Sequence, residues 1–293
     1  MGVKVGDIVG RKSYGYDILF KVDSIEVRMD GGKIIYIKGL NYRLLADAPE
    51  SDLAIMPLSK INDENSLFEK RLGKLTKKSG LVSQPKPVKR LFMREEYATF
   101  ERPGKVLHVD GDNDYLNMSM KYYKEQEINA VGKLVKEMDQ PKLIRSLLEE
   151  TKPDIVVITG HDSMSKFGGA APGSKEYNSI DRYKNSKYFI EAVKEARKYQ
   201  QSFDELVIVA GACQSYYEGI LAAGANFASS PGRILIHALD PGMLCRQIAY
   251  MPIDRVAPLE EVLKGTMTGL EGMGGIQTRG KLRAGMPKSP YIQ

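Results

Sequence analysis

Two stretches of one design decide the fold of this chain: Asp154-Ile-Val-Val-Ile-Thr-Gly-His-Asp-Ser163 and Leu206-Val-Ile-Val-Ala-Gly-Ala-Cys-Gln-Ser215. Each opens with a nearly continuous apolar run, the pattern of a strand whose two faces are both buried. Each run is followed by a glycine and then a chemically reactive side chain. From residue 104 onward such runs alternate with helical patterns. The alternation predicts an α/β domain with a mostly parallel sheet and helices on both faces.

The two reactive side chains are His161 and Cys213, each two or three residues past its apolar run. If the runs form neighbouring strands, about 4.8 Å apart, both side chains emerge at one rim of the sheet. Cysteine attacks as a thiolate, and a nearby imidazole accepts its proton. We predict Cys213 as nucleophile and His161 as base. Main-chain N–H groups of Gly160, Ala212 or Cys213 would form an oxyanion hole, and a helix starting after Cys213 would favour the thiolate.

Other nucleophiles and bases are weaker candidates. Cys245 has apolar neighbours in a helical pattern and is predicted to lie in the core. His108 falls inside the first apolar run, whereas His237 ends a predicted fifth strand, Arg233–His237, and remains a rival base. A serine nucleophile at Ser215 lacks the Gly-x-Ser-x-Gly pattern. The scattered Cys and His residues have no zinc-ligand spacing, so neither a metal nor another cofactor is expected.

The paired frames resemble those of the caspase, gingipain and clostripain group of cysteine peptidases, although Asp162 follows the histidine where that group usually has glycine. The whole chain is similar to the sporulation-specific YabG protease family. The similarity is carried by Val5-Gly-Asp-Ile-Val9, Ile158-Thr-Gly-His-Asp-Ser163, Gly211-Ala-Cys-Gln-Ser215 and Gly274-Gly-Ile-Gln-Thr-Arg-Gly280. The resemblance implies a caspase-like endopeptidase that cleaves spore coat and morphogenetic proteins after Arg or Lys, in the mother cell cytoplasm and the spore coat.

A basic substrate side chain requires a buried carboxylate in the S1 pocket, the site for the residue before the cleaved bond. Asp110 and Asp112, after the first apolar run, are the first candidates, and Asp162 and Asp240 are the others. The alternative for Asp110-Gly-Asp-Asn-Asp114 is a turn with Asp114 as the N-cap of a helix.

Composition divides the chain into four parts: residues 1–50, a small SH3-like β-barrel; 51–103, a basic linker with a helix around Ile61–Leu75; 104–264, the peptidase domain; and 265–293, a Gly-rich, basic, loop-like tail. No apolar run is long enough for a membrane span.

The net charge of +6 is uneven, because Lys70–Arg94 alone carries nine basic residues and no acidic one. Such a run is typical of a solvated linker. The alternative is a non-enzymatic scaffold or nucleic-acid-binding protein that uses the barrel and this linker. Since the run has few aromatic residues for base stacking, nucleic acid is the less favoured partner.

Overall fold

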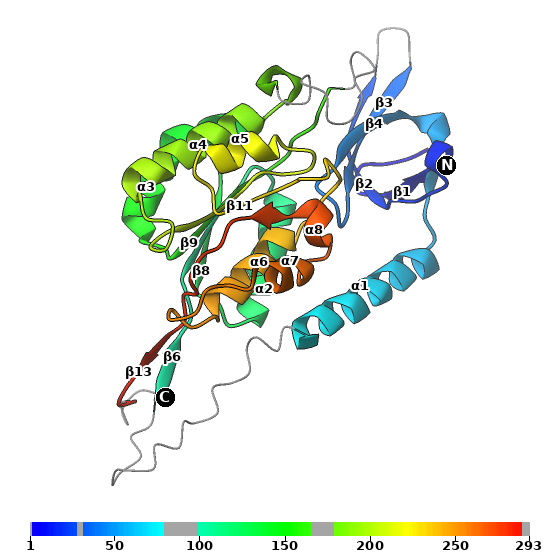
Figure 1. Cartoon of the computed structure of the whole chain (residues 1–293). Coiled ribbons are helices and arrows are strands. Elements are labelled where there is room, and N and C mark those ends of the chain that lie inside the picture. Colours follow the sequence, from blue (N-terminus) through cyan, green and yellow to red (C-terminus); the bar gives the residue numbers. More distant parts are fainter. Residues whose placement is uncertain (1, 28–31, 79–98, 166–178, 289–293) are drawn as a thin grey trace.

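The structure is a computed structural model that describes residues 2–27, 32–78, 99–165 and 179–288 (Figure 1). Its N-terminal part is a five-stranded antiparallel sheet in the order β4-β3-β2-β1-β5. The strands are β1 (Ile8–Arg11), β2 (Phe20–Val27), β3 (Lys33–Gly39), β4 (Leu45–Pro49) and β5 (Leu53–Ile55). Alternate apolar side chains of these strands form a separate small core that includes Val9, Val22 and Ile37. We call residues 2–55 the N-terminal module.

Helix α1 (Leu58–Lys78) connects the N-terminal module to the second sheet. It covers the helix expected around Ile61–Leu75. Phe68, Leu72 and Leu75 on one face of the helix pack against the core of the α/β part. Five of the nine basic residues of the basic run lie in α1, and residues 79–98, which carry the other four, lie outside the described residues.

The second sheet has the order β12-β11-β10-β9-β7-β8, and only β12 runs antiparallel to its neighbour. Its strands are β7 (Val106–Asp110), β8 (Ala130–Leu134), β9 (Ile155–Thr159), β10 (Val207–Ala210), β11 (Phe227–Ala228) and β12 (Gly274–Gly275). The prediction of a largely parallel α/β sheet is therefore confirmed.

Helices cover both faces of this sheet (Figure 1). Successive side chains of a strand point to opposite faces, so each buried strand contributes side chains to two hydrophobic cores, one on each face of the sheet. Val157 and Val209 pack with α2 (Asn113–Glu125), α6 (Asp240–Ala249) and α7 (Leu259–Lys264). Val156 and Ile208 pack with α3 (Gln140–Thr151), α4 (Ser186–Tyr199) and α5 (Tyr217–Ala222). The sheet is thereby held rigid up to its carboxyl edge, where the reactive residues follow.

Two segments differ from the sequence prediction. Residues 233–237 do not form a fifth strand of the sheet, because β11 takes that place beside β10. The tail does not run as a loose loop from residue 265: helix α8 (Gly269–Gly272), strand β12 and strand β13 (Arg283–Gly285), which pairs with β6 (Phe100–Arg102), all lie in it. Met273 in this tail is fully buried. Among the helices of the described ranges, none combines the length and apolar character needed to cross a bilayer.

Candidate active site

Three reactive residues follow three adjacent strands at the same distance along the chain, and we call these three residues the row. In the ladder between β9 and β10, Ile158 lies beside Ala210, and in the ladder between β7 and β9, Val109 lies beside Ile158. Three residues beyond these partners come Asp112, His161 and Cys213. The three residues therefore follow adjacent strands of the sheet at matching positions in sequence. The expected neighbourhood of the two strands is confirmed, and Asp112 joins the row.

The imidazole of His161 is held by Asp112. Nε2 of His161 lies 3.0 Å from Oδ2 of Asp112. Burial acts to raise the pKa of Asp112, but the hydrogen bond from His161 and the charge of Lys38 lower it below its ordinary value. Asp112 also accepts the main-chain N–H of Asp114 and Tyr115, which makes Asp112, rather than Asp114, the N-cap of α2. A carboxylate fixed by a helix N-terminus therefore orients the histidine ring.

The other ring nitrogen, Nδ1 of His161, is buried and has no hydrogen-bond partner within the described residues. The main-chain N–H of His161 donates to Oε1 of Glu137 at 2.7 Å. A Cβ atom at Gly160 would collide with this same Glu137 carboxylate, which explains the glycine before the histidine. Asp112 and Glu137 thus fix the ring and the backbone of His161, and Nδ1 is left for a further partner.

Cys213 stands at the second position of a tight turn, Ala212–Ser215, closed by a 3.4 Å bond from Ser215 N–H to Ala212 C=O. Its thiol is buried, and burial raises the pKa of Cys213 to about 12. Sγ accepts the main-chain N–H of Ile236 at 3.2 Å. Helix α5 begins only at Tyr217, and its expected lowering of the thiol pKa is outweighed by burial. In the part of the chain that the structure describes, Sγ makes no hydrogen bond with His161.

The predicted oxyanion-hole donors lie in this turn and beside the histidine. The N–H of Ala212 donates to Oγ of the buried Ser215 at 2.9 Å, so it is already engaged. Ser215 in turn donates to Asp162, which gives it a structural role instead of a nucleophilic one. Gly160 and Cys213 remain proposed donors for an oxyanion.

Asp110 is one of two fully buried residues among the four predicted S1 carboxylates, and Asp240 is the other. It forms an ion pair with the fully buried Arg43, whose Nη1 lies 2.9 Å from Oδ2. His108 lies 3.4 Å from the same oxygen. Burial acts to raise the pKa of Asp110, but the charge of Arg43 and the nearby imidazole of His108 bring it below the ordinary value. Asp110 thus already holds a basic side chain of its own chain, that of Arg43.

Asp162 is buried, and its carboxylate accepts hydrogen bonds from several neighbouring segments. It accepts the N–H groups of Ser163 and Asn185 at 2.9 and 2.8 Å and the hydroxyls of Ser186 and Ser215. Burial raises the pKa of its carboxyl even against these bonds. Asp162 therefore links the segment after His161 to α4 and to the turn Ala212–Ser215, which we call the cysteine turn.

Asp240 likewise accepts hydrogen bonds from two separate segments of the chain. It accepts the N–H of His237 at 2.9 Å and that of Met267 at 2.6 Å, together with the hydroxyl of Thr268. Burial raises the pKa of Asp240 to about 6. The rival base His237 stacks on Phe68 with ring centroids 5.1 Å apart, and Nδ1 of His237 accepts the N–H of Leu239. The structure does not bring Asp240 or Asp162 to Arg43.

Sequence reasoning missed three residues at this site: Arg43, Tyr115 and Glu137. Tyr115, in the first turn of α2, packs its ring 5.5 Å from that of His161 and 5.1 Å from the guanidinium of Arg43. No local pattern marks Arg43, because its partner is 67 residues away in another sheet. Glu137 lies in a 3₁₀ turn, Glu137–Asp139, whose packing under Gly160 is a tertiary contact.

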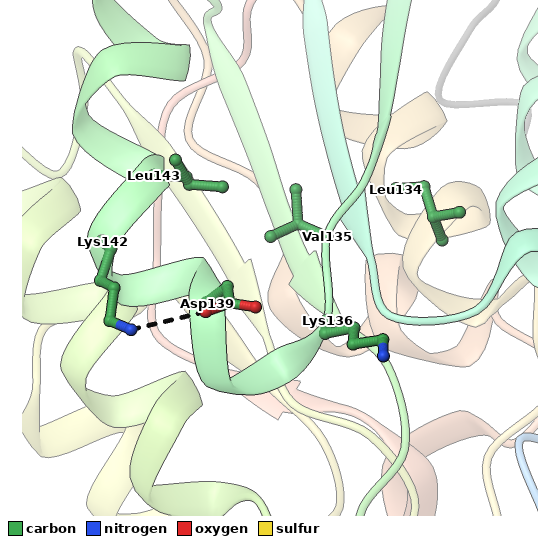
Figure 2. A pocket seen from close by; sticks show the side chains of 6 residues that line it. All are labelled: Leu134, Val135, Lys136, Asp139, Lys142 and Leu143. Carbon is green, nitrogen blue, oxygen red and sulfur yellow. Dashed lines mark ion pairs between the residues drawn. The ribbon is translucent and has the colours of Figure 1, made fainter.

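Two cavities are lined by described residues. One, of about 290 Å³, is at the end of β8 and contains the ion pair of Lys142 with Asp139 at 3.5 Å (Figure 2). Another, of about 160 Å³, lies between Tyr42, Phe68 and His237. Within the described ranges, no group of three or more His, Cys, Asp or Glu side chains is arranged to hold a metal ion.

Comparison with known proteins places these residues in a peptidase. The model of the family described as YabG peptidase U57 matches residues 4–287, which include both sheets and all of the row. The chain belongs to this family.

A curated relative agrees with this assignment. The sporulation-specific protease YabG of Bacillus subtilis (strain 168) is 39% identical over 297 aligned positions. The alignment covers 98% of this chain and 99% of the relative. The resemblance stated from sequence motifs is thereby confirmed, and it supports a protease role.

Proposed function

We propose that this chain is a cysteine endopeptidase in which Cys213 is the nucleophile, His161 the general base and Asp112 the residue that positions the histidine. The observation that supports the proposal is the shared register of β7, β9 and β10, the three adjacent strands that these residues follow. A nucleophile, a base and an orienting acid in this order are the parts of an acyl-transfer site.

The chemistry follows from the two ring nitrogens of His161. With Nε2 bonded to Asp112, Nδ1 accepts the proton of the Cys213 thiol as sulfur attacks the scissile carbonyl carbon. The pair of electrons moves to the carbonyl oxygen, where main-chain N–H groups of Cys213 and Gly160 stabilise the charge. Collapse breaks the C–N bond, and the leaving nitrogen takes the proton from His161. Water then adds to the thioester with His161 as base, which releases the acid and restores the thiol.

We assign the S1 pocket to Asp110 and infer cleavage after Arg or Lys. The carboxylate is fully buried, and the guanidinium of Arg43 that pairs with it also contacts the ring of Tyr115 and the carbonyl of Ala238. A bidentate guanidinium suits such a pocket better than an ammonium does. Asp112, Asp162 and Asp240 are then support residues and do not contact the substrate side chain.

The natural substrates proposed from the family are spore coat and morphogenetic proteins, met in the mother cell cytoplasm and in the spore coat. A sporulation-specific relative supports that setting. The caspase-like fold, with the peptidase domain from about residue 104, is supported by the parallel sheet with His161 and Cys213 after neighbouring strands. For the N-terminal module we propose an SH3-like barrel, supported by its five antiparallel strands.

The test uses the full chain and two fluorogenic peptides that differ only in Arg or Gln before the cleaved bond. Cys213→Ala and His161→Ala should each lower kcat by more than about 1,000-fold on the Arg peptide. Asp110→Asn should lower the ratio of kcat/KM for the Arg peptide to that for the Gln peptide about 100-fold, since only the Arg peptide loses a charge partner.

Cleavage at the wild-type rate by both Cys213→Ala and His161→Ala would exclude the proposed site. Equal losses on the two peptides in Asp110→Asn would instead assign Asp110 to folding and leave the nucleophile unaffected. Circular dichroism of each variant separates these outcomes from loss of structure.

A further inference from the structure

A short piece of the N-terminal module lies against the cysteine turn as an added strand. The N–H of Ala238 donates to the carbonyl of Asn41 at 2.8 Å, and the N–H of Arg43 donates to the carbonyl of Ile236 at 3.4 Å. Tyr42 and His237 form the antiparallel bridge between these bonds. An extended peptide that adds to an exposed edge in this way is a common mode of peptide recognition. We call residues 41–43 the docked segment.

The docked segment ends with its arginine in the pocket that the proposed function assigns to substrate. The side chain of Arg43 is fully buried and donates to Asp110 at 3.0 Å and to the carbonyl of Ala238 at 3.3 Å. Nε of Arg43 has no hydrogen-bond partner within the described residues. Burying an incompletely bonded ion pair is a poor way to stabilise a fold, since apolar side chains of similar size do as well. Stabilisation of the fold therefore does not explain why Arg43 and Asp110 form a buried ion pair, and we look for a functional explanation.

The same segment reaches the reacting groups. Ile236, which pairs with Arg43, is also the residue whose N–H donates to Sγ of Cys213 at 3.2 Å. The hydroxyl of Tyr115 donates to the carbonyls of Gly39 and Tyr42 at 2.7 and 2.6 Å while its ring packs on His161.

Strand β3, which precedes the docked segment, also contacts Asp112, the proposed orienting acid. Lys38, near the end of β3, lies 3.2 Å from Asp112 and 2.7 Å from Asp114. The N-terminal module therefore contacts the pocket, the base and the orienting acid together.

We propose that the docked segment occupies the substrate groove of its own chain, with Arg43 in the S1 pocket, and keeps the peptidase latent until the segment withdraws. This proposal rests on the proposed function. It assigns main-chain positions 236–238 as the edge on which a substrate strand pairs, and it makes an arginine-containing peptide the competitor of the docked segment. The cysteine is then freed to turn from Ile236 toward Nδ1 of His161.

The decisive experiment uses the wild-type chain and a tripeptidyl arginine chloromethyl ketone, which alkylates an active-site cysteine. Labelling is driven to completion with excess ketone, and the adduct on Cys213 is verified by mass. Hydrogen exchange of residues 39–44 is then compared with that of the unlabelled chain. Exchange in this segment should rise at least tenfold, whereas β1 and β2 should stay as before. A Cys213 adduct with unchanged protection of residues 39–44 would overturn the proposal.

A variant gives the complementary result. Arg43→Gln leaves the S1 pocket without its occupant, so the initial rate on the Arg peptide should rise about tenfold or more. Arg11→Gln is the matched control, because Arg11 pairs with Asp52 inside the same module at 3.0 Å and touches no site residue.

An Arg43→Gln chain that folds but is no faster than the wild type would refute latency, while Cys213→Ala separately reports whether the peptidase itself is correctly assigned. If Arg43→Gln fails to fold, the exchange experiment on the wild-type chain still decides.

Discussion

The two cysteines of this chain are nearly identical in burial and acidity and differ in where they lie. Cys213 and Cys245 are both buried, and burial raises the pKa of each thiol to about 12. Cys245 lies in α6 within an apolar core that includes Leu244 and Ile248. Cys213 lies beyond the carboxyl end of β10, in the row with His161. The proposal of Cys213 as nucleophile therefore rests on its position after β10, because its pKa does not distinguish it from a core thiol.

The largest expected difference is in peptide hydrolysis by single alanine variants of the two cysteines. Cys213→Ala should lose more than about 1,000-fold in kcat, because the attacking sulfur is gone. Cys245→Ala should keep kcat within about twofold and lose about 1 kcal/mol of unfolding free energy through a small cavity. Kinetics on the Arg peptide and urea unfolding measure both. A loss of activity of equal size in Cys245→Ala would remove the distinction between the two thiols.

A smaller effect is expected at the orienting acid. Asp112→Asn preserves the N-cap of α2, since asparagine caps as well as aspartate, but removes the charge that faces His161. We expect kcat to fall about 100- to 10,000-fold while KM changes little. Asp114→Asn is the matched control, because Asp114 also pairs with Lys38 and does not contact the histidine. Similar losses in both variants would mean that the contact with Lys38, and not the orientation of His161, matters.

The smallest effect concerns a charge that faces only one thiol. After burial, the negative charge of Asp240 is among the causes that raise the pKa of Cys213, and it is not among those for Cys245. Since the pKa of Asp240 is about 6, its carboxyl is ionised at pH 8. Asp240→Asn should therefore lower the Cys213 pKa and speed its alkylation at pH 8 several-fold.

Cys245 provides the internal reference for this measurement by mass spectrometry of the alkylated peptides. Its rate should not change in Asp240→Asn. The acceleration at Cys213 should disappear below pH 5, where the wild-type Asp240 is largely protonated as well. Equal acceleration of both cysteines would indicate a loosened fold instead of an electrostatic effect.

Local sequence patterns were sufficient to predict the central strands, and the same patterns supply the proposed nucleophile and base. The apolar runs of β9 and β10 are buried on both faces, so composition alone marks them, and the glycine-flanked frames select His161 and Cys213. Edge elements were not predictable in this way. Strand β12 is the pair Gly274–Gly275, which carries no apolar signal, and it exists because β11 offers an open edge.

The remaining errors have a common cause, which is pairing between distant parts of the chain. The apolar residues of 233–237 suggested a strand, yet this segment bonds to Cys213 and to the N-terminal module instead of to the sheet. Asp110 was a candidate for binding a basic side chain, but nothing near it in sequence indicates Arg43. Such contacts depend on how two sheets dock, and periodicity within one segment carries no information about docking.

The link between Arg43 and Asp110 has a consequence for how substrates compete. Both residues belong to one chain, so the segment is present at the pocket at an effective concentration that dilution of the enzyme does not alter; for short tethers this is in the millimolar range. A dilute, freely diffusing protein would seldom displace it. A protein packed at high density in a layered assembly, with many arginines exposed side by side, reaches that concentration locally and would be cut in preference.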